Sequence, residues 1–219
     1  MRVPAALAVL ASALVAHTGY LVVRPTTPAL ALRSSPAGPV VTTVGRRGLF
    51  GGPLELSVVS RRGRWLGVTS EALPNGRLGW IDASRGVSVS TIHTAIEVDL
   101  AARRLTVLQA GHVVRRVAVA IGRADTPTPV GRFAVTEKLP GPRYSAAAYG
   151  CCILALSARQ PHLPAGWSRS STSFIAIHGG GGIGSAASAG CLHASERDLR
   201  WLMRAIPLGT PVFIRRGFA

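Results

Sequence analysis

The sequence predicts a mostly β fold, in which a small β-barrel-like domain precedes a β-sandwich-like domain with one helix near its C-terminal side. Three observations predict it. Short apolar runs, several of them alternating with polar residues, recur along the chain. The 25 glycines and 15 prolines among 219 residues fall largely between these runs, as expected for strands joined by turns. A helical apolar stripe stands out after Ser195.

The first 31 residues predict an export segment. Met1 and Arg2 precede an apolar run from Val3 to Ala16, which is typical of a secretory signal, and Ala29–Ala31 suits cleavage. The apolar character continues through residues 20–23, so a single membrane anchor is the alternative. Either interpretation predicts an exported protein. The proline-containing stretch that follows, residues 32–39, predicts a linker without regular structure.

Residues 40–90 predict the small β domain. The strand-like runs are separated by glycines and by the turn sequence Pro74–Gly76. The expected strands are Leu54–Val59, Trp65–Val68 and Leu78–Ile81. The polar stretch from Asp82 to Thr94 predicts the boundary with the second domain.

Residues 92–216 predict the larger domain. Its expected strands are Ala95–Leu100, Arg104–Leu108, Val113–Ile121, Phe133–Thr136 and Val212–Ile214. The stretch from Pro140 to Gly166 predicts a long irregular loop, in which Tyr144 and Tyr149, with Trp167 just beyond, either line a cleft or pack the loop down. Ser195 caps a helix whose residues Leu199, Leu202, Met203 and Ile206 form one apolar stripe.

Residues 174–193 carry the chemistry. The apolar run Phe174–Ile177 predicts a buried strand that presents His178 at its end, and a glycine-rich loop returns the chain to Cys191. A histidine within hydrogen-bond reach can take the proton of a thiol and create a nucleophile. The small residues before Cys191 leave room for a substrate carbonyl, and backbone N–H groups near Gly190 are candidates for an oxyanion hole.

Plainer interpretations exist for each of these residues. A single cysteine is usually a small buried apolar residue, and a histidine at a strand end is usually only packed. The spacing Gly179-x-Gly181-x-x-Gly184 also matches a phosphate-binding pattern, but such a site needs the glycines to open a helix within a strand–helix–strand unit. The residues after Gly184 lead to a cysteine and another glycine instead. The combination of His178, the glycine spacer and Cys191 favours catalysis.

The motif His-Gly, glycine-rich spacer, Ser-x-Gly-Cys-aliphatic resembles the active-site signature of the L,D-transpeptidases, the YkuD-type catalytic domain. The string Thr-Pro-Thr-Pro-x-Gly-x-Phe from Thr126 to Phe133 is similar to a second hallmark of that family, which uses it as scaffold. The segment Trp65–Ile81 resembles bacterial Src-homology-3-like domains found beside cell-wall enzymes, and it acts either as a wall-binding module or as a spacer.

The resemblance implies roles for individual residues. Cys191 would be the nucleophile, His178 its base and Gly179 the residue whose carbonyl orients that base. Oxyanion or substrate contacts are expected from Ser188, Ala189, Gly190, His193, Tyr144 and Tyr149. Two positions depart from the family: Ala189 stands where histidine is frequent, and His193 where arginine or asparagine is common.

The implied reaction is acyl transfer between peptidoglycan stem peptides through a thioester, which needs no cofactor or metal. Carbapenem-type β-lactams are the implied covalent inhibitors. A cysteine hydrolase (an L,D-carboxypeptidase) using the same site and an inactive wall-binding protein are the alternatives.

The formal net charge of +16 predicts a polyanionic neighbour. Anionic wall polymers fit this charge, and a solvated basic surface is the alternative. No basic helix, zinc spacing or aromatic-studded basic sheet supports nucleic-acid binding. The three cysteines leave at least one thiol free. Cys151 and Cys152 are adjacent, and we expect two small residues at the start of a strand, because a disulfide between neighbours is uncommon.

Overall fold

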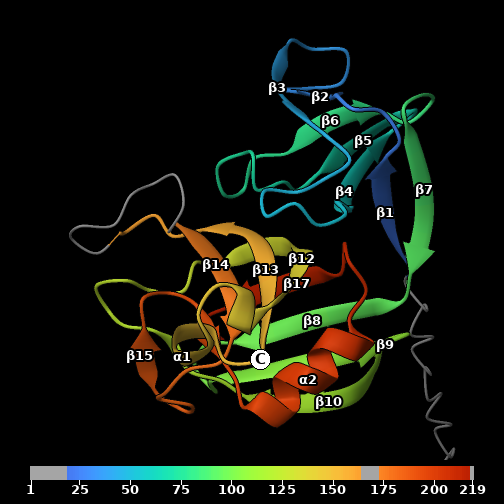
Figure 1. The fold of residues 1–219 in the computed structure, drawn as a ribbon. Helices are drawn as coiled ribbons and strands as arrows, with labels where there is room; N and C mark the ends of the chain where they lie inside the picture. The colour runs from blue at the N-terminus through green and yellow to red at the C-terminus, as the bar shows by residue number, and fades with distance from the viewer. Residues whose placement is uncertain (1–18, 164–172, 218–219) are drawn as a thin grey trace, which may run out of the picture.

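The computed structural model describes residues 19–163 and 173–217, and it confirms a mostly β protein with a helix near the C-terminus. An N-terminal antiparallel sheet and a larger, curled catalytic sheet lie next to each other (Figure 1). Strand β7 of the first sheet ends at Ile92 and strand β8 of the second begins at Thr94, so a single residue, His93, connects them.

The N-terminal sheet has the strand order β3-β2-β6-β5-β4-β1-β7. Its strands are β1 (Tyr20–Pro25), β2 (Leu30–Arg33), β3 (Val40–Val44), β4 (Leu56–Arg62), β5 (Trp65–Val68), β6 (Gly79–Asp82) and β7 (Val87–Ile92). One face buries a compact apolar cluster that includes Val23, Leu32, Leu54, Leu56 and Ile81. Burial of these side chains is what holds the small domain together.

The catalytic sheet has the order β10-β9-β8-β17-β12-β13-β14-β16, with β11 and β15 forming a separate two-stranded ladder. Its elements are β8 (Thr94–Asp99), β9 (Arg104–Gln109), β10 (His112–Ala118), β11 (Ile121–Gly122), β12 (Gly131–Pro140), a 3₁₀ turn (Gly141–Arg143), α1 (Ala146–Tyr149), β13 (Cys152–Arg159), β14 (Phe174–His178), β15 (Ala186–Ser188), β16 (Leu192–His193), α2 (Glu196–Ala205) and β17 (Pro211–Arg215). The β14–β16 and β17–β8 pairs are parallel.

Helix α2 packs on the catalytic sheet as its sequence predicts. Ser195 Oγ accepts the N–H of Asp198 and so caps the first turn. Leu199 and Leu202 are fully buried in the main core cluster. At the other end, Lys138 Nζ donates to two carbonyl oxygens near the helix C-terminus, at 2.8 and 2.9 Å, where a cation is favourable. The helix therefore fixes the chain just beyond the cysteine.

Part of the stretch expected to be an export segment is folded. Strands β1 and β2 occupy residues 20–25 and 30–33, and β1 lies between β4 and β7 with Val23 fully buried. The expected linker, residues 32–39, begins inside β2 and has no strand between Arg33 and Val40. The prolines lie at strand ends and in turns, where their missing N–H costs nothing. The folded sheet therefore begins at Tyr20, inside the stretch expected to be an export segment, whose residues 1–18 lie outside the described part. Neither α-helix of the described residues is long and apolar enough to span a bilayer.

The polar stretch from Asp82 to Thr94, where the domain boundary is expected, contains strand β7, which pairs with β1 along six consecutive residues, and the change of sheet falls at His93. The polar sequence of β7 suits an edge strand with both faces largely exposed. The expected long loop from Pro140 to Gly166 contains β13, which is buried on both faces and therefore shows no alternation of polar and apolar residues. Trp167 lies outside the described residues.

Candidate active site

Strand β14 carries His178 into the interior of the catalytic domain. The strand lies between β13 and β16, and its residues from Ile175 to His178 are buried. The His178 side chain is only 6% exposed, and its Nδ1 lies 2.5 Å from the carbonyl oxygen of Gly179. Because a carbonyl can only accept, Nδ1 carries the hydrogen, and Nε2 is left with a free lone pair. Gly179 itself is tied back by its N–H to Tyr149 O at 2.9 Å.

Cys191 is brought to the same place by strand pairing. It directly precedes β16, whose Leu192 pairs with Ile177 and whose His193 pairs with His178. Cys191 is a free cysteine of intermediate exposure, and its Sγ lies 3.8 Å from the carbonyl oxygen of Phe174. The expected strand, turn and return therefore bring the sulfur and the imidazole to one cleft.

Burial sets the protonation states of this pair. Desolvation lowers the pKa of His178 to about 4, although the bond to the Gly179 carbonyl favours the protonated ring. Desolvation also raises the pKa of the Cys191 thiol to about 11. At neutral pH the resting site therefore holds a neutral thiol and a neutral imidazole. Such a pair can react by general base catalysis, with the imidazole taking the thiol proton as the sulfur attacks.

The cleft has a volume of about 700 Å³, and its surface is mostly apolar. Four of the residues expected to contact substrate line it: Tyr144, Tyr149, Ala189 and His193. The ring of Tyr149 meets that of His178 edge to face, with 5.0 Å between centroids. The ring of His193 lies 4.8 Å from that of His178, and its own Nδ1 lies 2.9 Å from Gly181 O. Two carbonyl-oriented imidazoles thus stand side by side in the cleft.

Ser188 and Gly190 lie behind the cysteine and are not among the lining residues. The Ser188 hydroxyl donates to Cys191 O at 2.6 Å and accepts the Gly190 N–H at 3.0 Å. The Gly190 N–H, a candidate for the oxyanion hole, is therefore already engaged. Gly190 adopts a φ of +117°, and a Cβ there would collide with the side-chain amide of Gln160, so this position requires glycine.

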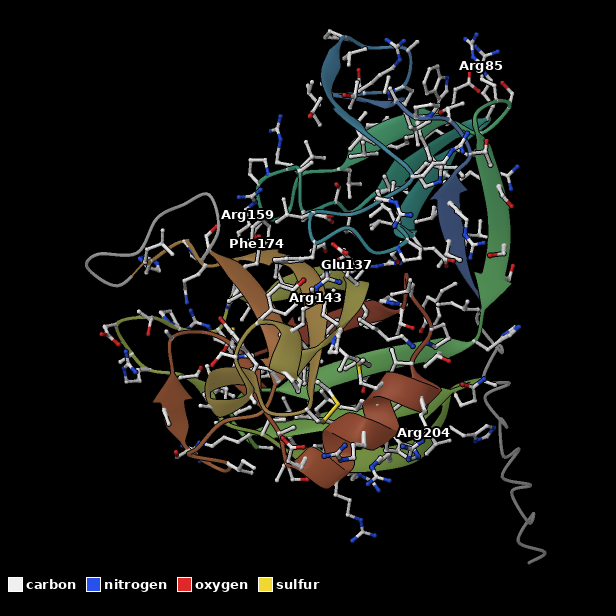
Figure 2. All side chains as sticks on the ribbon, viewed as in Figure 1. Arg85, Glu137, Arg143, Arg159, Phe174 and Arg204 are labelled. Carbon is white, nitrogen blue, oxygen red and sulfur yellow. A yellow bond between two sulfur atoms is a disulfide. The ribbon has the colours of Figure 1, made fainter. Side chains whose placement is uncertain are left out.

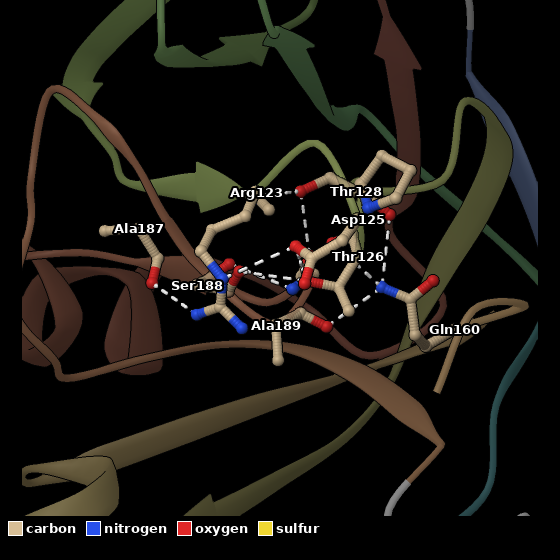
Figure 3. A network of polar contacts seen from close by, with 11 residues as sticks. Arg123, Asp125, Thr126, Thr128, Gln160, Ala187, Ser188 and Ala189 are labelled. Atoms are coloured by element: carbon tan, nitrogen blue, oxygen red, sulfur yellow. Dashed lines mark hydrogen bonds and ion pairs between the residues drawn. The ribbon is translucent and has the colours of Figure 1, made fainter. Parts of the chain in front are cut away.

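The Thr-Pro-Thr-Pro segment acts on the cysteine loop through buried threonines (Figure 3). Thr128 Oγ1 donates to Gly190 O at 2.8 Å and accepts the N–H of Gly122 at 2.9 Å. Thr126 is also buried, with its hydroxyl 3.4 Å from Ser188 O. The segment therefore positions the residues that lead into Cys191, as the scaffold interpretation predicts.

Gln160 is a positioning residue that sequence reasoning missed. Its side-chain amide is 3% exposed and donates toward the carbonyl oxygens of Thr126 and Pro127, each at 3.1 Å. The same nitrogen donates toward Ala189 O at 2.9 Å, which joins the two loops (Figure 3). A glutamine at a strand end gives no sequence signal of this kind, because its partners are remote along the chain.

The expectation for Cys151 and Cys152 is wrong in part. Cys152 begins β13 as expected, but the two sulfurs form a disulfide. The Cys151 N–H also donates to Glu196 Oε1 at 2.8 Å, in the first turn of α2. Cys191 is then the one free thiol, since the other two cysteines are joined.

Comparison with known proteins agrees with this geometry. The family described as the YkuD L,D-transpeptidase catalytic domain matches residues 93–214, more than half of the chain. The chain belongs to this family. A Bacillus licheniformis protein, provisionally named L,D-transpeptidase YkuD, is 28% identical over 153 residues, which cover 66% of this chain and 82% of that protein.

Solved structures resemble this chain at lower sequence identity and with low TM-scores. The structure of Bd1075 from Bdellovibrio bacteriovorus is 22% identical, with a TM-score of 0.44, and covers 57% of this chain, which spans about half (49%) of that one. An Enterococcus faecium L,D-transpeptidase catalytic domain, described as acylated by ertapenem, is 22% identical with a TM-score of 0.38, over 56% of this chain and 96% of that one. Superpositions this loose establish nothing further about this chain.

Proposed function

We propose that this protein is a cysteine L,D-transpeptidase that cross-links peptidoglycan through a thioester on Cys191. The observation that carries the proposal is the geometry at the end of β14, where this strand pairs with β16. There the Gly179 carbonyl fixes the hydrogen of His178 on Nδ1, which leaves Nε2 basic in the cleft that also holds the free thiol of Cys191. Family membership supplies the reaction class.

In the first step, His178 Nε2 takes the proton of Cys191 as the sulfur attacks the carbonyl of the diaminoacyl residue in a donor tetrapeptide. A carbon–sulfur bond forms, and the amide bond to the terminal D-alanine breaks. The imidazolium returns its proton to the departing amine, so His178 is neutral again. Its low pKa makes this imidazolium a strong acid, which assists departure of the poor leaving group.

In the second step, the side-chain amine of another stem attacks the thioester. His178 accepts a proton from that amine, a new amide bond forms, and the carbon–sulfur bond breaks. The proton then passes to the sulfur and restores the thiol. The thioester conserves the acylating power of the first amide, so the residues of the chain suffice for both steps.

The proposed surroundings are the cell envelope. A net charge of +16 suits anionic wall polymers, and the proposed substrates lie in the cell wall, so export of the chain is part of the proposal. Carbapenem-type β-lactams are proposed as covalent inhibitors, since they offer a reactive carbonyl to the same sulfur.

Intact-mass analysis tests the proposal. The protein is incubated with a carbapenem and, separately, with a tetrapeptide stem and a labelled acceptor amine, beside Cys191→Ala and His178→Ala. We expect a stoichiometric adduct on the unaltered protein, none on Cys191→Ala, and a labelled cross-linked product.

Release of D-alanine without label in the product would replace the transferase with a hydrolase. Complete absence of adduct and product would leave only a wall-binding role. In that case Cys191→Ala should leave binding to isolated cell walls unchanged.

A further inference from the structure

A loop of the N-terminal domain reaches into the catalytic domain at Glu137. This residue lies on β12, is 1% exposed, and sits where the two domains meet (Figure 2). Its carboxylate accepts the N–H of Phe50 at 2.7 Å and the N–H of Gly52 at 2.6 Å. The loop between β3 and β4 therefore closes around a side chain from the other domain.

The fit between loop and carboxylate is close. A Cβ on Gly48 would lie 2.5 Å from a Glu137 oxygen, and one on Gly52 would lie 2.7 Å from the other. Gly51, with a φ of +84°, makes the turn between the two donors. Among the described residues no lysine or arginine pairs with Glu137. Charge-assisted bonds from the loop backbone are therefore what compensates the burial of this carboxylate.

The hydrogen bonds between the loop and Glu137 determine the position of the Phe50 ring. It meets the ring of Tyr144 edge to face, at 6.1 Å between centroids, and the ring of Phe174 at 6.0 Å. It lines the cleft that contains Cys191, and both residues pack against one small apolar cluster, which includes Ile153. The N-terminal domain thus supplies part of the wall of the candidate active site.

A second interdomain contact supports the same wall. The Arg159 guanidinium lies 4.5 Å from the centre of the Phe174 ring. The same guanidinium donates to Glu71 O of the N-terminal domain, at 2.9 and 2.6 Å, and the Arg159 backbone exchanges hydrogen bonds with Asn75. Figure 2 shows Arg159 and Phe174 at this junction. Both aromatic neighbours across the domain boundary are therefore fixed in place.

The aromatic wall is open to a ligand. Phe50 and Phe174 are only half-buried, and Tyr144 is 41% exposed. A phenylalanine that served domain packing alone would be expected to lose its contact with solvent. Half-exposed rings beside a nucleophile are surfaces on which methyl and methylene groups pack, with the area removed from water favouring binding.

We propose that Phe50 is a substrate-binding residue that contacts the aliphatic part of the donor stem peptide, and that Glu137 is the positioning residue that holds it there. The proposal rests on the proposed transpeptidase function and adds that the N-terminal domain is part of the donor site. A chain without that domain would retain the cysteine and histidine but lack one wall.

The test compares Phe50→Ala with Leu49→Ala in the full chain. Leu49 is the matched control, because it lies on the same loop, is 52% exposed and is not among the lining residues. In a Cys191→Ala background, Phe50→Ala should raise the Kd for a tetrapeptide stem about five- to tenfold, and Leu49→Ala should change it less than about twofold. With Cys191 present, KM should rise by a similar factor while kcat changes little.

Glu137→Gln tests the positioning role. An amide presents a donor to one of the two N–H groups, so one bond is lost and the loop is released. KM should rise as for Phe50→Ala, with kcat and the rate of alkylation by iodoacetamide preserved. The double variant should be no worse than Phe50→Ala alone, because Glu137 acts through Phe50. Thermal unfolding identifies a variant that has lost its fold. Phe50→Tyr, which keeps the aromatic ring, should have the same KM as the unaltered protein.

Equal Kd values for Phe50→Ala and Leu49→Ala would overturn the inference, as would faster acylation of Phe50→Ala, which would mark the ring as an obstruction. The binding arm requires no turnover. Peptide binding that depends on Phe50 in a protein with no acylation would therefore remove the proposed function and keep the inference. Absence of any peptide binding would remove both.

Discussion

The two sides of the cleft differ in how they are built. The reactive side, with His178 and Cys191, lies within 14 residues of sequence and is assembled by pairing of β14 with β16. The aromatic side brings together Phe50, Tyr144 and Phe174 from segments spread over the whole chain. The proposed nucleophile and base are thus neighbours along the chain, whereas the aromatic wall proposed to bind the substrate depends on the packing of the two domains.

The largest expected effect is a loss of activity when the reactive side loses His178. His178→Ala removes the base and should lower kcat/KM for peptide about 10²- to 10⁴-fold, the usual contribution of a positioned proton acceptor. His162→Ala is the control, because His162 is exposed and its ring has no assigned role. Steady-state kinetics on both variants measures the difference. A loss of less than about tenfold in His178→Ala would show that the reactive side does not use this imidazole.

The next effect concerns the burial of the same imidazole. The pKa of His178 is about 4 in the folded protein and near 6.5 when unfolded. Between these values the unfolded chain binds the proton and the folded chain does not, so stability is present above about pH 6.5 and is lost as pH falls toward 4. The loss should amount to about 2 to 3 kcal/mol by about pH 4.5.

Urea unfolding of the unaltered protein and of His178→Gln, at about pH 7 and pH 4.5, isolates this contribution because other titrating groups are common to both. The unaltered protein should lose more stability than the variant. The acid limb of kcat/KM should also fall well below pH 6.5. An acid limb near pH 6.5 would mean that the imidazole is solvated in the working enzyme.

A smaller effect concerns the support behind the cysteine. Thr128→Val keeps the shape of the side chain but leaves the Gly122 N–H and the Gly190 carbonyl without their partner. We expect a loss of about 1 to 3 kcal/mol in unfolding free energy, and a fall in kcat larger than the rise in KM. Thr106→Val, on the half-exposed face of β9, should change neither. Unchanged kinetics in Thr128→Val would separate the Thr-Pro-Thr-Pro segment from the reactive side.

The smallest effect concerns the disulfide between Cys151 and Cys152 and requires no substitution. Without reductant, denatured protein should show one reactive thiol per chain, and three after reduction, because Cys151 and Cys152 are joined. Thiol titration before and after reduction checks this count. Three thiols without reductant would restore the interpretation of two unlinked cysteines at the start of β13.

Features that depend on neighbours along the chain can be predicted from the amino-acid sequence. A buried apolar run followed by His-Gly predicts a strand that ends in a base, and Ser195 with its apolar stripe predicts the capped helix α2. The strands with clear turns between them, such as β5 and β6, were predicted for the same reason. These properties follow from backbone periodicity and turn chemistry, which act over a few residues.

The remaining features depend on contacts between segments that are distant along the chain. Strand β1 lies where the sequence predicts an export segment, because a strand paired on both sides needs no turn or alternation of its own. Phe50, Glu137 and Gln160 carry no sequence signal, since the contacts that define their roles join distant segments, such as Phe50 with Glu137 and Gln160 with Ala189. Their roles arise when domain packing removes water from a carboxylate or an amide, which must then find its hydrogen bonds across the fold.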